Sequence, residues 1–88
     1  MSGNDHHNLW TLYILRCADN TLYTGITNNL ERRIEEHNGR GKAAKYTRSR
    51  QPVTLVYQEN CDSRSAATKR EILIKKLSKA DKEALVSP

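Results

Sequence analysis

The sequence contains no phenylalanine and a single tryptophan, and only 36% of its 88 residues are hydrophobic. A chain of this length forms one domain with a single small core, because little of its surface is far from solvent. The shortage of large apolar side chains favours a thin α+β arrangement over a thick two-sheet sandwich. We expect a modest free energy of unfolding, with little to spare for large deletions in the core.

Long apolar runs, internal repeats and low-complexity tracts are also missing. No stretch approaches the roughly 20 apolar residues that a membrane-spanning helix needs. Residues 1–8 are polar, do not resemble a signal peptide and lack periodicity, so we expect a disordered N-terminal tail. We therefore expect a cytoplasmic protein that makes no contact with membranes and has a single ordered domain over residues 9–86.

Cysteine is scarce too. Cys17 and Cys61 lie far apart in the sequence and do not have the spacing of metal ligands. Because the chain shows no export signal, we interpret both as reduced thiols.

Positive charge, in contrast, is plentiful. Cations exceed acidic residues by five, and the sequence pI is about 9.5. Basic domains commonly bind nucleic acids because neutralising phosphates releases counterions, although a basic surface that serves only solubility has the same composition. Residues 40–50 hold five cations and no acidic residue, which indicates a mobile loop that contacts phosphates. Its candidate nucleic-acid-binding residues are Lys42, Lys45, Tyr46, Arg48 and Arg50.

The hydrophobic pattern predicts an antiparallel hairpin followed by a helix. Residues 9–17 and 22–27 are rich in β-branched and aromatic residues, and the connection between them is too short for a parallel crossover. Asn28 or Asn29 caps the helix that follows, and residues 38–39 (Asn-Gly) end it.

The residue pattern in the second half of the chain predicts one more strand and two more helices. A long polar loop leads to a strand over residues 53–59. Asp62 or Ser63 caps a helix to about Leu77, and Ser78 caps a short final helix. The candidate core residues of the longer helix are Ala66, Ala67, Ile72, Leu73, Ile74 and Leu77. The predicted fold class is α+β, a small three-stranded antiparallel sheet flanked by helices in the order β-β-α-β-α-α.

Two tyrosines on the neighbouring strands of the hairpin are the first candidates for chemistry. Tyr13 and Tyr23 stand ten residues apart, and Gly25 follows at a point where a backbone or ligand can approach closely. A phenol can donate to a phosphate or accept a proton from water. A lone tyrosine on a strand more often packs with its hydroxyl at the rim of a core, and that interpretation stays open.

Arg33 and His37 lie four residues apart on the predicted first helix and therefore project from one face. Together they offer a bidentate clamp for phosphate and a group that moves protons near neutral pH. The alternative is a solvated arginine and a histidine that favours the helix end. Glu71, at the edge of the buried face of the second helix, is a candidate Mg²⁺ ligand or an ordinary exposed charge.

Taken together, these residues resemble the GIY-YIG nuclease superfamily, in particular its small stand-alone members of the UPF0213 type. The likeness runs from about residue 9 to residue 85. Residues 11–13 (Thr-Leu-Tyr) stand at the first triad, and residues 23–25 (Tyr-Thr-Gly) stand at the second. The other matching segments are residues 29–37, 45–48, 52–57, 69–71 and 74–79.

The resemblance implies a hydrolase that cleaves DNA phosphodiester bonds with one divalent metal, Mg²⁺ or Mn²⁺, held by Glu71. Arg33 would bind the scissile phosphate. Tyr23 would act as general base or orient the water, with His37 accepting its proton, and Tyr13 would position phosphate or water. Branched, damaged or single-stranded DNA would be the substrate, in repair or recombination. A monomer is the default expectation.

The sequence departs from the family pattern at three points. The first triad lacks its glycine and isoleucine, Thr24 replaces isoleucine in the second, and no asparagine follows Glu71, where many members carry one. A non-catalytic DNA- or RNA-binding module is the alternative function. A protein-interaction module that uses the sheet edge is the third.

Overall fold

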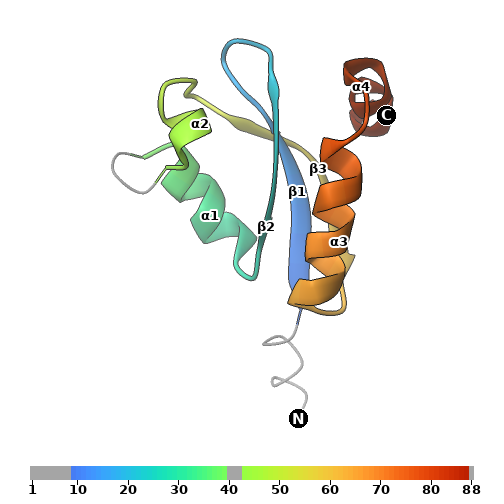
Figure 1. Cartoon of the computed structure of the whole chain (residues 1–88). Helices are drawn as coiled ribbons and strands as arrows, with labels where there is room; N and C mark the ends of the chain where they lie inside the picture. Colours follow the sequence, from blue (N-terminus) through green and yellow to red (C-terminus); the bar gives the residue numbers. More distant parts are fainter. Residues whose placement is uncertain (1–8, 40–42, 88) are drawn as a thin grey trace.

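The computed structural model describes residues 9–39 and 43–87 (Figure 1). The predicted disordered tail, residues 1–8, and the candidate Lys42 lie outside the described residues. The elements are β1 Trp10–Arg16, β2 Leu22–Thr27, α1 Leu30–His37, α2 Lys45–Arg48, β3 Thr54–Cys61, α3 Arg64–Lys75 and α4 Lys79–Val86. The predicted α+β class and element order are confirmed, with the short helix α2 as an addition.

The three strands form one antiparallel sheet in the order β2-β1-β3, so β1 is the central strand. In the hairpin register Tyr13 lies opposite Gly25, and Leu12 lies opposite Ile26. Successive side chains of a strand point to opposite faces of the sheet. Leu12 and Ile14 therefore face one side of the sheet, and Tyr13 faces the other.

Each face of the sheet has its own small core, and different helices cover the two faces (Figure 1). On one face, Leu30 and Ile34 of α1 pack against the cluster that contains Tyr13. On the other face, Ile74 of α3 and Leu85 of α4 pack with Leu12 and its neighbours. Because β2 is an edge strand, groups from α1 and α3 can meet beside it.

Polar caps set the helix boundaries as the sequence predicts. The Asn29 side chain accepts a hydrogen bond from the backbone N–H of Arg32, and α1 ends at the C-cap Asn38. The hydroxyl groups of Ser63 and Ser78 cap α3 and α4 in the same way. Such caps satisfy N–H groups that have no partner inside the helix.

Two expectations about the helices are wrong. The segment predicted as an uninterrupted loop contains α2 and the fully buried Thr47. Of the six candidate core residues of α3, only Ala67 and Ile74 are buried, whereas Ile72, Leu73 and Leu77 are 48%, 57% and 37% exposed. A single helix face meets a three-stranded sheet, so the apolar residues outside that stripe stay in solvent.

The thiols of Cys17 and Cys61 are free, with Cys17 buried. Within residues 9–39 and 43–87, none of the helices combines the length and apolar character of a membrane span.

Candidate functional site

The Tyr13 phenol lies directly across the backbone of Gly25 on the neighbouring strand. A Cβ atom at position 25 would stand 2.6 Å from the Tyr13 hydroxyl oxygen and 2.7 Å from Cζ, far inside contact distance. Tyr13 itself is 1% exposed. Glycine is therefore required at position 25 because the ring of Tyr13 occupies the volume of a side chain there.

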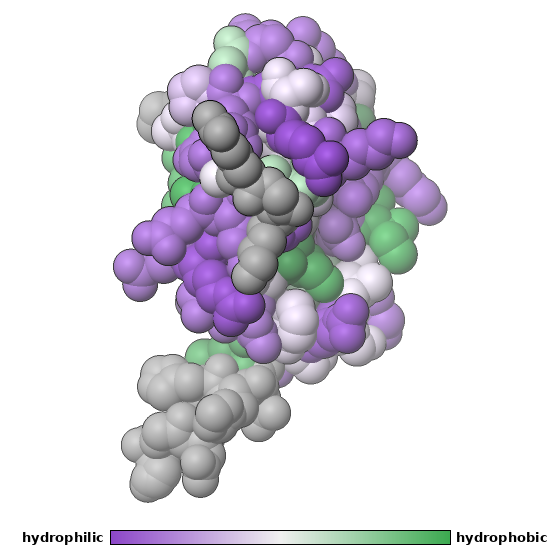
Figure 2. Space-filling view, turned by 90° about the vertical axis from the view of Figure 1, so that its left-hand side faces the viewer, coloured by the Kyte–Doolittle hydropathy of each residue, from purple (hydrophilic) through white to green (hydrophobic). Residues whose placement is uncertain are grey.

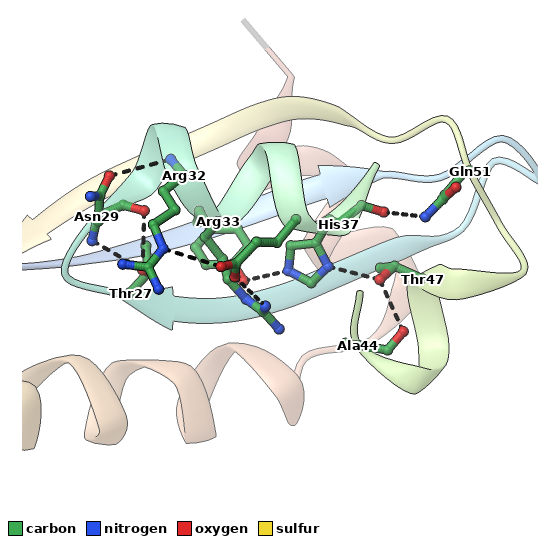
Figure 3. A network of polar contacts seen from close by, with 10 residues as sticks. Thr27, Asn29, Arg32, Arg33, His37, Ala44, Thr47 and Gln51 are labelled. Atoms are coloured by element: carbon green, nitrogen blue, oxygen red, sulfur yellow. Dashed lines mark hydrogen bonds and ion pairs between the residues drawn. The ribbon is translucent and has the colours of Figure 1, made fainter. Parts of the chain in front are cut away.

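A buried chain of hydrogen bonds starts at this phenol and ends on α2 (Figure 3). The Tyr13 hydroxyl lies 2.8 Å from Nε2 of His37, and Nδ1 of His37 lies 2.7 Å from the Thr47 hydroxyl oxygen. Thr47 in turn donates to the backbone carbonyl of Ala44 at 3.2 Å. The Gln51 amide donates to the main-chain carbonyl of His37 at 2.7 Å and so holds the end of α1.

The direction of this chain fixes the tautomer of His37. With the Thr47 hydroxyl proton directed to the Ala44 carbonyl, the Thr47 oxygen accepts from His37, and this arrangement places the imidazole proton on Nδ1. The unprotonated Nε2 then accepts from Tyr13. The order of donors is thus Tyr13 to His37, His37 to Thr47 and Thr47 to Ala44.

The acidities of these groups agree with that assignment. Burial, and then the positive charge of Arg33, lower the pKa of His37 to about 4, so its imidazole is neutral at pH 7. Burial, and then the nearby Tyr23, raise the pKa of Tyr13 to about 12, against the opposing hydrogen bond from Arg33. The phenol is therefore protonated and able to donate.

An aromatic column connects this buried chain to the surface. The Tyr23 ring packs edge-on against His37 with centroids 5.1 Å apart, and the Tyr46 ring stacks on Tyr23 at 5.9 Å. The Arg50 guanidinium covers the Tyr46 ring at 4.0 Å and also forms an ion pair with Asp19 at 2.9 Å. Arg50, a candidate phosphate contact, thus has an acidic partner already.

Arg33 brings positive charge to the same place from α1. Its Nη1 atom is 2.8 Å from a carboxylate oxygen of Glu36, and it hydrogen-bonds the Tyr13 hydroxyl. Burial tends to lower the pKa of Arg33, but the bonds to Glu36 and Tyr13 outweigh it and raise that pKa. The side chain is 27% exposed. A shallow surface pocket of about 150 Å³ lies beside it, lined by Thr27, Asn28, Asn29, Arg32, Arg33 and Glu36.

Glu71 approaches from α3, the helix on the other face of the sheet. Its side chain is 20% exposed and lies 3.2 Å from Lys75 Nζ one turn later. The negative charge of Glu71 is close enough to Tyr13 to contribute to the raised pKa of that phenol, after burial and Tyr23. Among residues 9–39 and 43–87 no three His, Cys, Asp or Glu side chains gather as metal ligands. A single partly exposed carboxylate fits Mg²⁺, which keeps several waters and needs few protein ligands.

The structure therefore brings three of the predicted site residues, Tyr23, Arg33 and His37, into contact with the Tyr13 phenol, and the charge of Glu71 acts on it from α3. Two features of the geometry bear on the roles that the resemblance implies. His37 is the hydrogen-bond partner of Tyr13 and not of Tyr23. Tyr13 is buried, so in this conformation its phenol supports the site from below, without direct access to a phosphate.

The candidate nucleic-acid residues separate into two groups. Tyr46 and Arg50 belong to the aromatic column, whereas Lys45 and Arg48 are exposed on α2. The α1 side of the molecule presents a largely hydrophilic surface (Figure 2).

Sequence reasoning missed two residues of the site. Glu36 is readable in principle, because an acidic residue three positions after Arg33 on a helix is placed to pair with it. Thr47 gives no such signal, since its contact with His37 joins two helices and depends on the tertiary fold.

The comparisons with known proteins identify the family of the chain. The model of the GIY-YIG catalytic domain matches residues 9–84. A UPF0213 protein of Desulfotalea psychrophila is 61% identical over 77 residues, covering 88% of this chain and 70% of that protein. A UPF0213 protein of Natronomonas pharaonis is 57% identical over 83 residues, covering 94% of this chain and 92% of that protein.

Solved structures give the same result. The solution NMR structure of a UPF0213 protein from Bacillus halodurans has a TM-score of 0.58 and 44% identity, covering 89% of this chain and 82% of that chain. A protein from E. faecalis, also solved by NMR, has a TM-score of 0.59 and 42% identity over 88% of this chain and 82% of that chain. The chain therefore belongs to the GIY-YIG catalytic-domain family, a family of nuclease-type domains, and is similar over most of its length to UPF0213 proteins.

Proposed function

We propose that the protein is a DNA endonuclease that hydrolyses phosphodiester bonds with one divalent metal ion, Mg²⁺ or Mn²⁺. The observation that carries the proposal is the approach of opposite charges to the two packed tyrosines. Arg33 hydrogen-bonds the Tyr13 hydroxyl, and Glu71 pairs with Lys75, which lines the same surface pocket as Tyr23. Arg33 from α1 and Glu71 from α3 both interact electrostatically with the Tyr13 phenol. A cation and a carboxylate that both act on the same phenol suit a phosphate with a bound metal.

Arg33 is the proposed phosphate ligand. Its guanidinium is held on one side by Glu36 and Tyr13, and about a quarter of the side chain remains open to solvent. A guanidinium fixed in advance stabilises the charge that develops on the phosphoryl oxygens in the transition state, without reorganising during the reaction. Glu36 and Tyr13 are positioning residues in this account.

Glu71 is the proposed metal ligand, with waters and a substrate phosphate completing the coordination. When bound, the metal supplies a lowered pKa for a water nucleophile and shields the charge of the leaving oxygen. Without a bound metal, the positive charge of Lys75 neutralises the Glu71 carboxylate.

Tyr23 is the proposed group that orients the attacking water or takes its proton. It is the more accessible of the two tyrosines, and its ring is fixed between His37 and Tyr46. Neutral His37 and protonated Tyr13 hold that ring and Arg33 in place from the buried side.

The test is cleavage of labelled DNA in Mg²⁺ and in Mn²⁺, with single-stranded, nicked, branched and blunt duplex substrates. Wild type is expected to cleave at least one of them, and Arg33→Ala and Glu71→Gln are each expected to lower single-turnover cleavage by about 10²-fold or more, as removal of a preorganised charge does. Glu35→Gln, which neutralises an exposed carboxylate on α1, is the matched control and is expected to cleave like wild type. Equal cleavage by all four proteins would falsify the assignment, since a contaminating nuclease then accounts for the products.

The alternative function is a nucleic-acid-binding module without catalysis, which the excess of five cations favours. In that case wild type binds DNA or RNA in a salt-sensitive manner, and neither Mg²⁺ nor Mn²⁺ leads to any cleavage. Titration of Mg²⁺ into ¹⁵N-labelled protein separates the two functions, because only the nuclease predicts amide shifts centred on Glu71.

A further inference from the structure

A shallow groove runs along the start of β2, on the far side of Tyr23 from His37. It consists of two adjoining pockets of about 350 and 220 Å³. The residues that line the two pockets are Thr21, Leu22, Tyr23, Thr24, Tyr46, Lys75, Lys79, Lys82 and Glu83. We call this feature the β2 groove.

The walls of the β2 groove differ in chemistry. Tyr46 forms one wall, and its ring is fixed by stacking on Tyr23 and by the Arg50 guanidinium at 4.0 Å. The other wall carries three lysines from two consecutive helices, Lys75 of α3 and Lys79 and Lys82 of α4. None of these lysines belongs to residues 40–50, where the sequence indicated the phosphate contacts.

The charge of the lysine wall is not balanced locally. The one acidic residue that lines the groove, Glu83, is bound by both terminal nitrogens of Arg16, at 2.7 and 3.0 Å. This bond, together with the charges of Arg16 and Lys79, lowers the pKa of Glu83. Of the residues that the structure describes, no acidic side chain forms an ion pair with Lys79 or Lys82. Because Arg16 already neutralises Glu83, the lysine wall keeps a net positive charge for a partner.

The β2 groove is continuous with the candidate active site at two points. Tyr23 lines the groove and also packs against His37. Lys75 lines the groove and lies 3.2 Å from Glu71, the proposed metal ligand. A chain of phosphates that enters at the lysines is thus led to Tyr23 and Glu71.

We propose that the β2 groove binds the phosphodiester backbone of a DNA strand next to the bond that is cut, with phosphates on Lys79 and Lys82. A polyanionic strand matches the unbalanced charge, and a narrow rigid aromatic wall on one side suits an extended strand. That the ligand is DNA rests on the proposed function. That the groove binds a polyanion is tested by binding measurements alone.

The experiment measures the binding of a fluorescein-labelled single-stranded DNA, and separately of a blunt duplex, by anisotropy in EDTA over a range of salt concentrations. The test variant is Lys79→Gln/Lys82→Gln, which removes two charges and keeps most of each aliphatic stem. Lys69→Gln/Lys76→Gln is the matched control, because Lys69 on α3 and Lys76 at its C-cap are both exposed and do not line the groove.

The slope of log affinity against log salt concentration is negative, and losing two phosphate contacts to a single strand makes it shallower by about 1.4. Near 0.1 M salt this corresponds to a Kd that is roughly 20-fold higher. The groove variant is expected to show this loss, and the control a clearly smaller one. Equal loss by both variants, or no loss by the groove variant, overturns the proposal. The proposal is also overturned if the groove variant loses more affinity for vesicles of anionic lipid than for DNA.

The two proposals fail separately. If the groove variant loses DNA binding but wild type cleaves no DNA, the proposed binding in the β2 groove stands and the proposed nuclease activity is refuted. Metal-dependent cleavage by wild type with unchanged DNA binding in the groove variant retains the nuclease and refutes the groove.

Discussion

Replacing Gly25 with alanine tests the packing on which the whole site depends. The added Cβ would stand 2.6 Å from the Tyr13 hydroxyl oxygen and 2.7 Å from Cζ, whereas real Cβ atoms essentially never approach a neighbour within 3.0 Å. The phenol must therefore move by roughly 0.5–1 Å. Because Tyr13 is 1% exposed, no open space receives it.

The movement has two costs. Overpacking a filled core costs about 1–3 kcal/mol. A shift of that size also strains the 2.8 Å hydrogen bond between Tyr13 and Nε2 of His37, and loss of this buried bond costs about 1–3 kcal/mol more. Gly25→Ala is therefore expected to lower the free energy of unfolding by about 2–6 kcal/mol, a large part of the stability of a small domain.

Urea unfolding at pH 7 measures this loss. Gly39→Ala is the control, because its added Cβ meets no atom closer than 3.2 Å, and it is expected to cost less. The reasoning is refuted if Gly25→Ala unfolds within about 0.5 kcal/mol of wild type and the His37 ring resonances stay unchanged.

Two further outcomes follow from the buried histidine. The folded-state pKa of His37 is about 4, below the value near 6.5 in the unfolded chain, so its contribution to stability is complete above pH 6.5 and is lost as the pH falls toward 4. Between pH 7 and pH 4 the free energy of unfolding of wild type is expected to fall by about 3 kcal/mol more than that of His37→Gln. Parallel curves of unfolding free energy against pH for the two proteins would contradict the lowered pKa. Thr47→Val removes the acceptor of the imidazole N–H and is expected to cost about 1–3 kcal/mol and to change the tautomer seen by ¹⁵N NMR. Thr47→Ser is expected to restore both, and failure of serine to restore the tautomer would show that the hydroxyl does not set it.

Local chemistry made much of the fold predictable. The hairpin follows from two apolar runs with a four-residue connection, and β2 spans residues 22–27 as the pattern indicates. Asn29, Ser63 and Ser78 start helices because each side chain accepts a hydrogen bond from a backbone N–H group a few residues later in the same segment. Such signals are read within one turn of chain and do not depend on the tertiary structure.

Contacts between distant segments were not predictable in the same way. Thr47 was not singled out because its role depends on His37, ten residues earlier, and on the placement of α2. His37 itself was placed on the correct helix face, but the choice between Tyr13 and Tyr23 as its partner depends on which strand is central. The apolar residues Ile72 and Leu73 look like core in sequence, yet the sheet is too narrow to cover them.

The shared site for metal and phosphate is the central claim, and binding of paramagnetic Mn²⁺ tests it most directly. Spectra of labelled protein recorded during an Mn²⁺ titration report which nuclei lie close to the bound ion. Broadening is expected to centre on Glu71 and to reach the ring protons of Tyr23, and both effects are expected to disappear in Glu71→Gln. Broadening confined to Asp19, Asp62 or Asp81, with Glu71 and Tyr23 unaffected, would contradict the claim.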